Sequence, residues 1–222
     1  MNATIDPLAP IVLAISYFGD VVFAISGALT AMRYRMDIIG VVLIGVITGI
    51  GGGTMRDLLI GRTVFWVQDP TEIVLCIISA TITFFFINDN ILRRRGMIWG
   101  DALGLAAFGV VGCHIALAHD VSWIVAVLMG MITATGGGVI RDVVTNTQPM
   151  ITSGQIYASC ALLGAGIYAG LSFLTLPVGV AEVIAFSAAL ALRAVTIHYD
   201  VRMGPRGTFI EIGKYKSTGN GM

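Results

Sequence analysis

Long apolar stretches alternate with short polar segments along the whole chain. Each stretch approaches the roughly 20 residues that an α-helix needs to cross a lipid bilayer. We therefore expect an all-α integral membrane protein with seven transmembrane helices, covering residues 10–32, 37–61, 71–87, 96–118, 121–144, 153–174 and 178–199. The connecting segments are too short to form a separate soluble domain.

Two segments of the chain are near copies of each other. GVITGIGGGTMRDLL begins at Gly45 and GMITATGGGVIRDVV begins at Gly130, 85 residues later. A shorter match pairs Gly19-Asp20 with Gly100-Asp101. Because each copy holds three expected helices, the second copy must enter the membrane upside down. We expect inverted three-helix repeats at residues 10–90 and 96–175, then a seventh helix at 178–199 and a flexible polar tail at 200–222.

Each copy carries three consecutive glycines inside an expected helix. Glycine disfavours a helix by about 1 kcal/mol per residue relative to alanine, so we expect a kink or a break at Gly51–Gly53 and at Gly136–Gly138. Non-helical backbone at membrane depth is tolerated only against protein or a water-filled cavity. The triplets, flanked by Thr48 and Thr133, therefore indicate a pore near the midplane. The alternative is that the glycines, Gly52 and Gly137 at their centres, only permit close helix packing.

An Arg-Asp pair follows each triplet. A charge within a membrane span costs about 2.5–3.5 kcal/mol, so each needs a partner or water. Adjacent residues on a helix point in different directions. We therefore expect cross pairing, Arg56 with Asp142 and Arg141 with Asp57. The alternative is that these side chains lie near helix ends and cap them or reach the interface.

Asp20 is expected near the middle of the first helix, with no basic residue beside it in sequence. An isolated acid at that depth indicates a cation contact or a protonatable group. The structural alternative is a buried acid that is bonded to hydroxyl groups or to Arg193.

Basic residues gather in alternate connections of the expected helices. They are Arg33, Arg35, Arg93, Arg94 and Arg95, together with Arg202, Arg206, Lys214 and Lys216 of the tail. Arg62 is the main exception. Lys and Arg favour the cytoplasmic side, which predicts an outer N-terminus and a cytoplasmic C-terminus in a cell (inner) membrane. Arg93, Arg94 and Arg95 are also candidates for an anionic-lipid contact.

Composition narrows the function further. Of the residues, 56% are apolar and 12% are charged, against about 25% charged in soluble domains. The net charge is zero, which gives no basis for nucleic-acid binding. Cysteines and histidines show no ligand spacing, and no nucleotide-binding or hydrolase motif is present. We expect no enzyme, no cofactor and no metal beyond transient monovalent cations.

Four segments resemble the prokaryotic branch of the trimeric intracellular cation (TRIC) channel family, also labelled a glycine transporter domain. They are FAISGALTA from Phe23, DIIGVVLIGVITGIGGGTMRDLL from Asp37, GDALGLAAFGVVG from Gly100 and GMITATGGGVIRDVV from Gly130. The resemblance implies a homotrimer of seven-helix protomers. Each protomer would conduct K⁺ and other monovalent cations through its own pore, bounded by kinked second and fifth helices at Gly51–Gly53 and Gly136–Gly138. Animal members carry a Lys-containing motif and a phosphoinositide site, which GGGTMRD and GGGVIRD do not reproduce.

Three functions remain open. The first is a K⁺-permeable homotrimeric channel, whose partners are its own copies, membrane lipid and monovalent cations. The second is a secondary transporter for glycine or another small zwitterion, because inverted repeats with broken helices suit a transporter equally well. The third is a structural or lipid-handling membrane protein without solute flux. Saturable, stereoselective uptake would favour the second function over the first.

Overall fold

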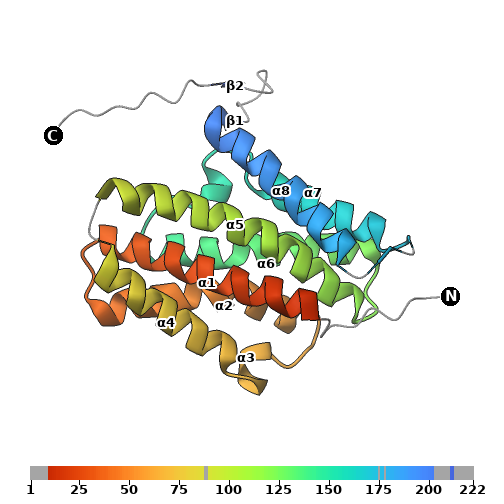
Figure 1. Ribbon diagram of the computed structural model, residues 1–222, viewed down its shortest axis with the longest axis horizontal. Helices are drawn as coiled ribbons and strands as arrows, with labels where there is room; N and C mark the ends of the chain where they lie inside the picture. The colour runs from red at the N-terminus through yellow and green to blue at the C-terminus, as the bar shows by residue number, and fades with distance from the viewer. Residues whose placement is uncertain (1–9, 88–89, 175, 178, 203–210, 213–222) are drawn as a thin grey trace.

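A computed structural model describes residues 10–87, 90–174, 176–177, 179–202 and 211–212 (Figure 1). The helices are α1 Pro10–Arg33, α2 Ile38–Leu59, α3 Phe65–Gln68, α4 Thr71–Phe86, α5 Asn90–Leu117, α6 Trp123–Val144, α7 Ala158–Leu171 and α8 Val180–His198. A 3₁₀ turn, η1 Met150–Thr152, precedes α7. Two short strands, β1 Val201–Arg202 and β2 Glu211–Ile212, pair antiparallel in the tail.

The chain is an all-α integral membrane protein, as predicted. Helices α1, α2, α5, α6 and α8 are long and apolar enough to cross a membrane, and α4 and α7 are shorter apolar helices of 16 and 14 residues. The sixth predicted helix starts later than residue 153, because η1 and a turn precede α7 at Ala158. The short helix α3 was not predicted, and the paired strands qualify the prediction of a flexible tail. Arg206, Lys214 and Lys216 lie outside the described residues.

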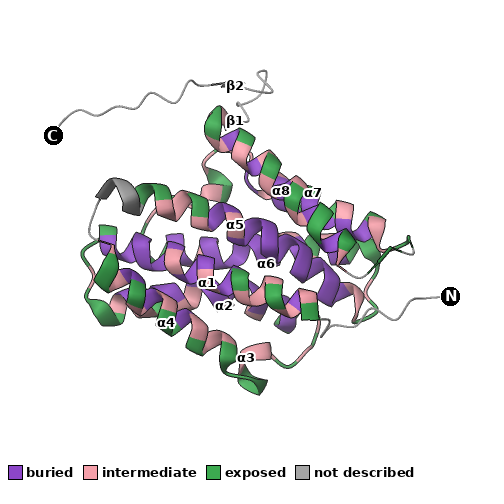
Figure 2. Cartoon of the chain, in the orientation of Figure 1, coloured by how far each residue is buried: buried purple, intermediate pink, exposed green. Residues whose placement is uncertain are grey.

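Helices α1, α2, α5 and α6 form the centre of the bundle, with α3 and α4 on one side and α7 and α8 on the other (Figure 1). Buried residues concentrate on these central helices (Figure 2). Helices α1 and α5, which begin the two repeats, run in opposite directions along the bundle (Figure 1). Below, the end of the bundle at which α1 begins is called the Pro10 end, and the opposite end is called the Arg33 end.

Both glycine triplets lie within unbroken helices. Helix α2 runs continuously through Gly51–Gly53 and α6 through Gly136–Gly138, so the predicted breaks are wrong. The triplets instead let the two helices touch backbone to backbone. A Cβ on Gly52 would overlap the Thr133 carbonyl, and a Cβ on Gly137 would overlap the Thr48 carbonyl. Close contact outweighs the weak helix propensity of glycine here, which is the alternative that the sequence left open.

Helices α2 and α6 are in close contact where the two triplets cross. A Cβ on Gly136 would lie 3.2 Å from the Cα of Gly52, and one on Gly51 would lie 3.4 Å from the Cα of Gly137. The hydroxyls of Thr48 and Thr133 donate to carbonyls of their own helices, those of Ile44 and Met129, at 2.6 Å each. The hydroxyl groups of Thr48 and Thr133 are thus used within their own helices.

Candidate functional site

The Arg-Asp pair that ends α2 is bonded within itself. Arg56 donates from Nε and from Nη2 to Asp57 Oδ1, at 2.8 Å in both cases. Asp57 Oδ2 accepts the backbone N–H of Phe65 at 2.9 Å. Asp57 bonds both to its neighbour in the helix and to the first residue of α3. The carboxylate thus fixes the segment that follows α2.

The second copy repeats this arrangement at the end of α6. Arg141 Nε donates to Asp142 Oδ1 at 2.8 Å, and Asp142 Oδ2 accepts the N–H of Met150 at 3.2 Å. The predicted cross pairing of Arg56 with Asp142 and of Arg141 with Asp57 is therefore wrong. The alternative prediction, that these groups cap helix ends, describes the geometry. Arg56 and Arg141 are nevertheless buried, at 3% and 0% exposure.

The two arginines differ in what their remaining donors do. Arg141 Nη1 lies 3.0 Å from Asp101 Oδ1 of α5 and donates at 3.0 Å to Ser26 Oγ of α1. These bonds tie α1, α5 and α6 together toward the Arg33 end. A Cβ on Gly138 would lie 3.0 Å from the Tyr157 hydroxyl oxygen and 3.4 Å from Asp101 Oδ1, so the third glycine makes room for this cluster.

Among the described residues, the Pro10 end has no counterpart of the Arg141–Asp101 ion pair. Within the described residues, Arg56 has no ion pair with Asp20, although Asp20 corresponds to Asp101 in the repeat. The Arg56 guanidinium carbon lies 5.9 Å from the centre of the Phe65 ring instead. Arg62 Nη1 approaches Asp57 Oδ1 at 3.9 Å. Both guanidinium groups are thus drawn toward Asp57.

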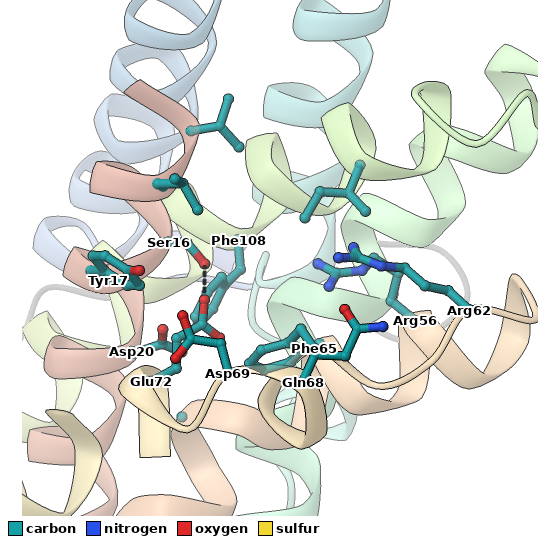
Figure 3. Close-up of a pocket in the computed structure, with 15 residues that line it drawn as sticks. Ser16, Tyr17, Asp20, Arg56, Arg62, Phe65, Gln68, Asp69, Glu72 and Phe108 are labelled. Carbon is teal, nitrogen blue, oxygen red and sulfur yellow. Dashed lines mark hydrogen bonds between the residues drawn. The ribbon is translucent and has the colours of Figure 1, made fainter. Parts of the chain in front are cut away.

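A cavity of about 130 Å³ occupies this unclosed end, between α1, α2, α5 and the α3–α4 segment. Figure 3 shows Asp20, Asp69 and Glu72 on one side of it and Arg56 and Arg62 on the other. Three carboxylates and two guanidinium groups therefore face one space. The cavity combines both signs of charge with the aromatic rings of its lining.

Asp20 lies about ten residues into α1, so it is roughly 15 Å from the start of that helix. Its side chain is 1% exposed, and its Oδ2 atom has no hydrogen-bond partner within the described residues. The alternative pairing with Arg193 is not what the structure shows, because Arg193 donates to the Ile156 carbonyl and to Gln155 Oε1. A buried carboxylate oxygen without a donor is costly unless a cation or proton joins it.

The other two carboxylates of the cavity are held by hydroxyl groups. Glu72 Oε1 accepts from Ser16 Oγ at 3.3 Å (Figure 3). Asp69 Oδ1, in the loop before α4, accepts from the Thr71 hydroxyl at 2.6 Å and from the Thr71 N–H at 3.0 Å. These hydrogen bonds hold the pKa of Asp69 below its ordinary value. Asp69 is consequently a fixed negative charge at the cavity.

Only part of the predicted site comes together here. Asp20 and Arg56 line the cavity, and Gly53 lines it with the last glycine of its triplet. Gly51, Gly52, Gly136 and Gly137 form the helix crossing, while Arg141 and Asp142 belong to the cluster toward the Arg33 end. Arg94 and Arg95 are exposed at the start of α5, and the side chain of Arg93 lies outside the described residues. Their contact with anionic lipid stays a prediction.

The sequence did not single out Glu72, Ser26, Tyr157 or Phe108. Glu72 follows Pro70 and reads as an ordinary acidic residue in the first turn of a helix, where the helix dipole favours it. The repeat held a usable signal, because the 85-residue spacing pairs Glu72 with Tyr157. The acidic Glu72 and the neutral Tyr157 occupy corresponding positions of the two repeats, and this difference in charge would have identified both as candidate site residues.

Comparison with known proteins identifies the family. The model of a family described as "Glycine transporter" matches residues 13–88 and 98–172. The UPF0126 inner membrane protein YadS of Escherichia coli K12 is 36% identical over 191 residues, which are 83% of this chain and 91% of that protein.

Solved structures match as well. The TRIC trimeric intracellular cation channel orthologue from Rhodobacter sphaeroides is 41% identical with a TM-score of 0.81, covering 85% of this chain and 98% of that one. A structure described under "Structural basis for conductance through TRIC cation channels" is 33% identical with a TM-score of 0.78, covering 87% and 96%.

Proposed function

Because the chain belongs to the TRIC cation channel family, whose model is also described as a glycine transporter, we propose that it conducts monovalent cations, K⁺ among them. The pathway lies within each protomer of a homotrimer. One observation carries this proposal: Asp20 is 1% exposed, one of its carboxylate oxygens has no hydrogen-bond partner among the described residues, and it lines a cavity that holds more carboxylates than guanidinium groups. Such a group attracts a partly dehydrated cation.

The proposed pathway enters at the cavity and continues along α1. Asp20 is followed on that helix by Phe23, whose ring centre lies 5.2 Å from that of Phe108, and then by Ser26. Ser26 is bonded to Arg141, which also holds Asp101. The conformation described here is therefore a closed one, in which the aromatic pair and the Arg141 cluster obstruct passage toward the Arg33 end.

The distribution of basic residues supports an orientation. Arg33, Arg35, Arg94 and Arg95 are exposed at the Arg33 end. Cytoplasmic loops carry an excess of Lys and Arg. We therefore propose that the protein lies in a bacterial inner membrane with the Arg33 end facing the cytoplasm and the cavity facing the outer side. Arg62 lies at the Pro10 end and lines the cavity, so it does not add to the excess of basic residues at the Arg33 end.

Proteoliposomes test the proposal directly. The wild-type protein should release trapped Rb⁺ or Tl⁺, and Asp20→Asn should slow that release at least tenfold. Asp37→Asn is the matched control, because Asp37 is an exposed cap of α2 that asparagine replaces well. Equal release by wild type and Asp20→Asn would contradict the pathway past Asp20.

A second function, transport of glycine or a similar zwitterion, is supported by the arrangement of charge in the cavity. Carboxylates of α1 and α4 face guanidinium groups of Arg56 and Arg62 (Figure 3), as an ammonium and a carboxylate of one small solute would require. Saturable uptake of labelled glycine that Asp20→Asn abolishes, in vesicles that show no release of Rb⁺, would favour this function over the channel.

A further inference from the structure

The two repeats carry the same Asp and Arg but differ at a third position. Asp20 and Arg56 of the first repeat correspond to Asp101 and Arg141 of the second. At the same 85-residue spacing that relates the arginines, Glu72 corresponds to Tyr157. Glu72 lies in the first turn of α4, and Tyr157 directly precedes α7. The inverted repeat thus places a carboxylate at the Pro10 end and a phenol toward the Arg33 end.

A residue outside the repeats increases this difference. Arg193 of α8 is 1% exposed, and its guanidinium carbon lies 5.0 Å from the centre of the Tyr157 ring. It brings a positive charge to the cluster that already contains the Arg141–Asp101 ion pair. Arg141 pairs with both carboxylates of that cluster, Asp101 and Asp142, and Arg193 adds a second positive charge beside Tyr157. One oxygen of Asp101, Oδ2, accepts no hydrogen bond among the described residues, but its other oxygen is held by Arg141.

The cavity at the Pro10 end holds more carboxylates than guanidinium groups. Asp20 and Glu72 both line it, whereas the two guanidinium groups there are engaged with Asp57, Arg56 at 2.8 Å and Arg62 at 3.9 Å. Asp20 Oδ2 has no partner within the described residues, and Glu72 accepts a hydrogen bond from Ser16. The carboxylates of Asp20, which is buried, and of Glu72, which is half-buried, therefore line one cavity together with the Ser16 hydroxyl.

We propose that Asp20 and Glu72 together bind one monovalent cation at the Pro10 end, and that the second repeat has lost the equivalent site. Carboxylate and hydroxyl oxygens are the ligands that hard cations prefer. Two guanidinium groups in the same cavity disfavour a doubly charged ion, and no three His, Cys, Asp or Glu side chains of the described residues are grouped as metal ligands. The inference rests on the proposed function only in identifying the bound ion with the permeant one.

The site has a consequence for conduction. A cation arriving from the Pro10 side meets a pair of carboxylates, whereas one arriving from the Arg33 side meets the charge-matched Arg141–Asp101 pair. Unitary current should therefore saturate at several-fold lower K⁺ concentration on the Pro10 side than on the Arg33 side. Glu72→Gln should remove this difference.

Binding can be measured without flux. The purified full-length protein is unfolded thermally in detergent while K⁺ replaces N-methyl-D-glucamine at constant ionic strength. A ligand that binds only the folded state raises Tm, by about 3 °C for a protein of this size at ten times its Kd. We expect this rise in the wild type and its loss in Glu72→Gln.

Two variants serve as controls. Glu182→Gln makes the same substitution at a buried acid of α8 that pairs with His114 at 3.5 Å, outside the cavity. Tyr157→Phe changes the corresponding position of the other repeat without altering charge. Both should keep the K⁺-dependent rise, measured against each variant's own Tm without K⁺.

Three results would overturn the site: an unchanged rise in Glu72→Gln, no rise in the wild type, or a rise on acidification with none in K⁺, which would make the pair a proton site. The experiments also distinguish failure of the proposed channel function from failure of the cation site. Vesicles without cation flux, combined with a K⁺ rise that Glu72→Gln abolishes, would contradict the channel and leave the site standing.

Discussion

The Nη1 atom of Arg141 lies 3.0 Å from Oδ1 of Asp101, and both side chains are fully buried. The same two residue types in the first repeat, Arg56 and Asp20, line a cavity and form no ion pair with each other within the described residues. A chain built from inverted repeats is thus closed by an ion pair toward one end and open to a cavity at the other. In the proposed pathway, this asymmetry corresponds to a closed state.

Loosening the closed cluster should raise cation flux. Ser26→Ala removes the acceptor at 3.0 Å from Arg141 Nη1. A hydrogen bond to a charged group contributes about 1.5–3 kcal/mol, so the ratio of open to closed states should rise about tenfold or more. Single-channel open probability measures the effect. Ser79→Ala is the control, since the Ser79 hydroxyl donates to the Leu75 carbonyl of its own helix. Equal open probability in both variants would contradict the proposal that the Arg141 cluster obstructs the pathway.

Trimming the aromatic pair should widen the pathway. Phe108 is 5% exposed and packs against Phe23, between the cavity and the Arg141 cluster. Phe108→Ala should increase unitary conductance at least twofold, although the lost packing also costs about 3–5 kcal/mol of stability. Phe85→Ala, at a side chain that is 61% exposed on α4, should leave conductance unchanged. A Phe108→Ala channel with wild-type conductance would place the narrowest point elsewhere.

Adding a methyl group at the helix crossing should destabilise the fold. In Gly52→Ala the new Cβ meets the Thr133 carbonyl, and overpacking of this kind costs about 1–3 kcal/mol. Gly166→Ala on α7 meets no atom within 4 Å and should be neutral or stabilising by up to about 1 kcal/mol. Thermal unfolding in detergent compares the two. Similar Tm values would mean that the triplets do not act through close packing.

Double-mutant cycles distinguish the observed charge pairs from cross pairs. Arg56→Gln and Asp57→Asn should show a coupling energy of about 0.5–3 kcal/mol, because the two residues share hydrogen bonds. Arg56→Gln and Asp142→Asn should be additive within about 0.5 kcal/mol. Strong coupling in the second cycle, read from unfolding free energies, would restore the cross pairing that the structure contradicts.

Local signals made the helices predictable. Helix α2 was expected over 37–61 and covers Ile38–Leu59, because Asp37 caps it by accepting the Gly40 N–H. Helix α6 was expected over 121–144 and covers Trp123–Val144, with Ser122 as its cap. The prediction of a break at the triplets was wrong because of a tertiary contact. Glycine propensity acts within one helix, whereas the benefit of Gly52 appears only when Thr133 of another helix lies against it.

The site was predictable only where it repeated a pattern. Asp20 stood out as an acid in an apolar run, and the Arg-Asp pairs stood out by duplication. The partners of Arg141, Asp101 and Ser26, come from two other helices, so no spacing in the chain reveals them. Glu72 was not predicted for a similar reason. It lines the same cavity as Asp20 only because α4 packs beside α1. The division into domains and the homotrimer remain predictions.

Planar-bilayer recording in asymmetric KCl distinguishes cation conduction from the other functions. We predict unitary currents that reverse near the K⁺ equilibrium potential and that Asp20→Asn strongly reduces, with Asp37→Asn behaving as the wild type. Currents that reverse toward the Cl⁻ potential would contradict cation conduction. A silent bilayer, together with saturable glycine uptake by the same preparation, would contradict the channel and assign the cavity to a transporter.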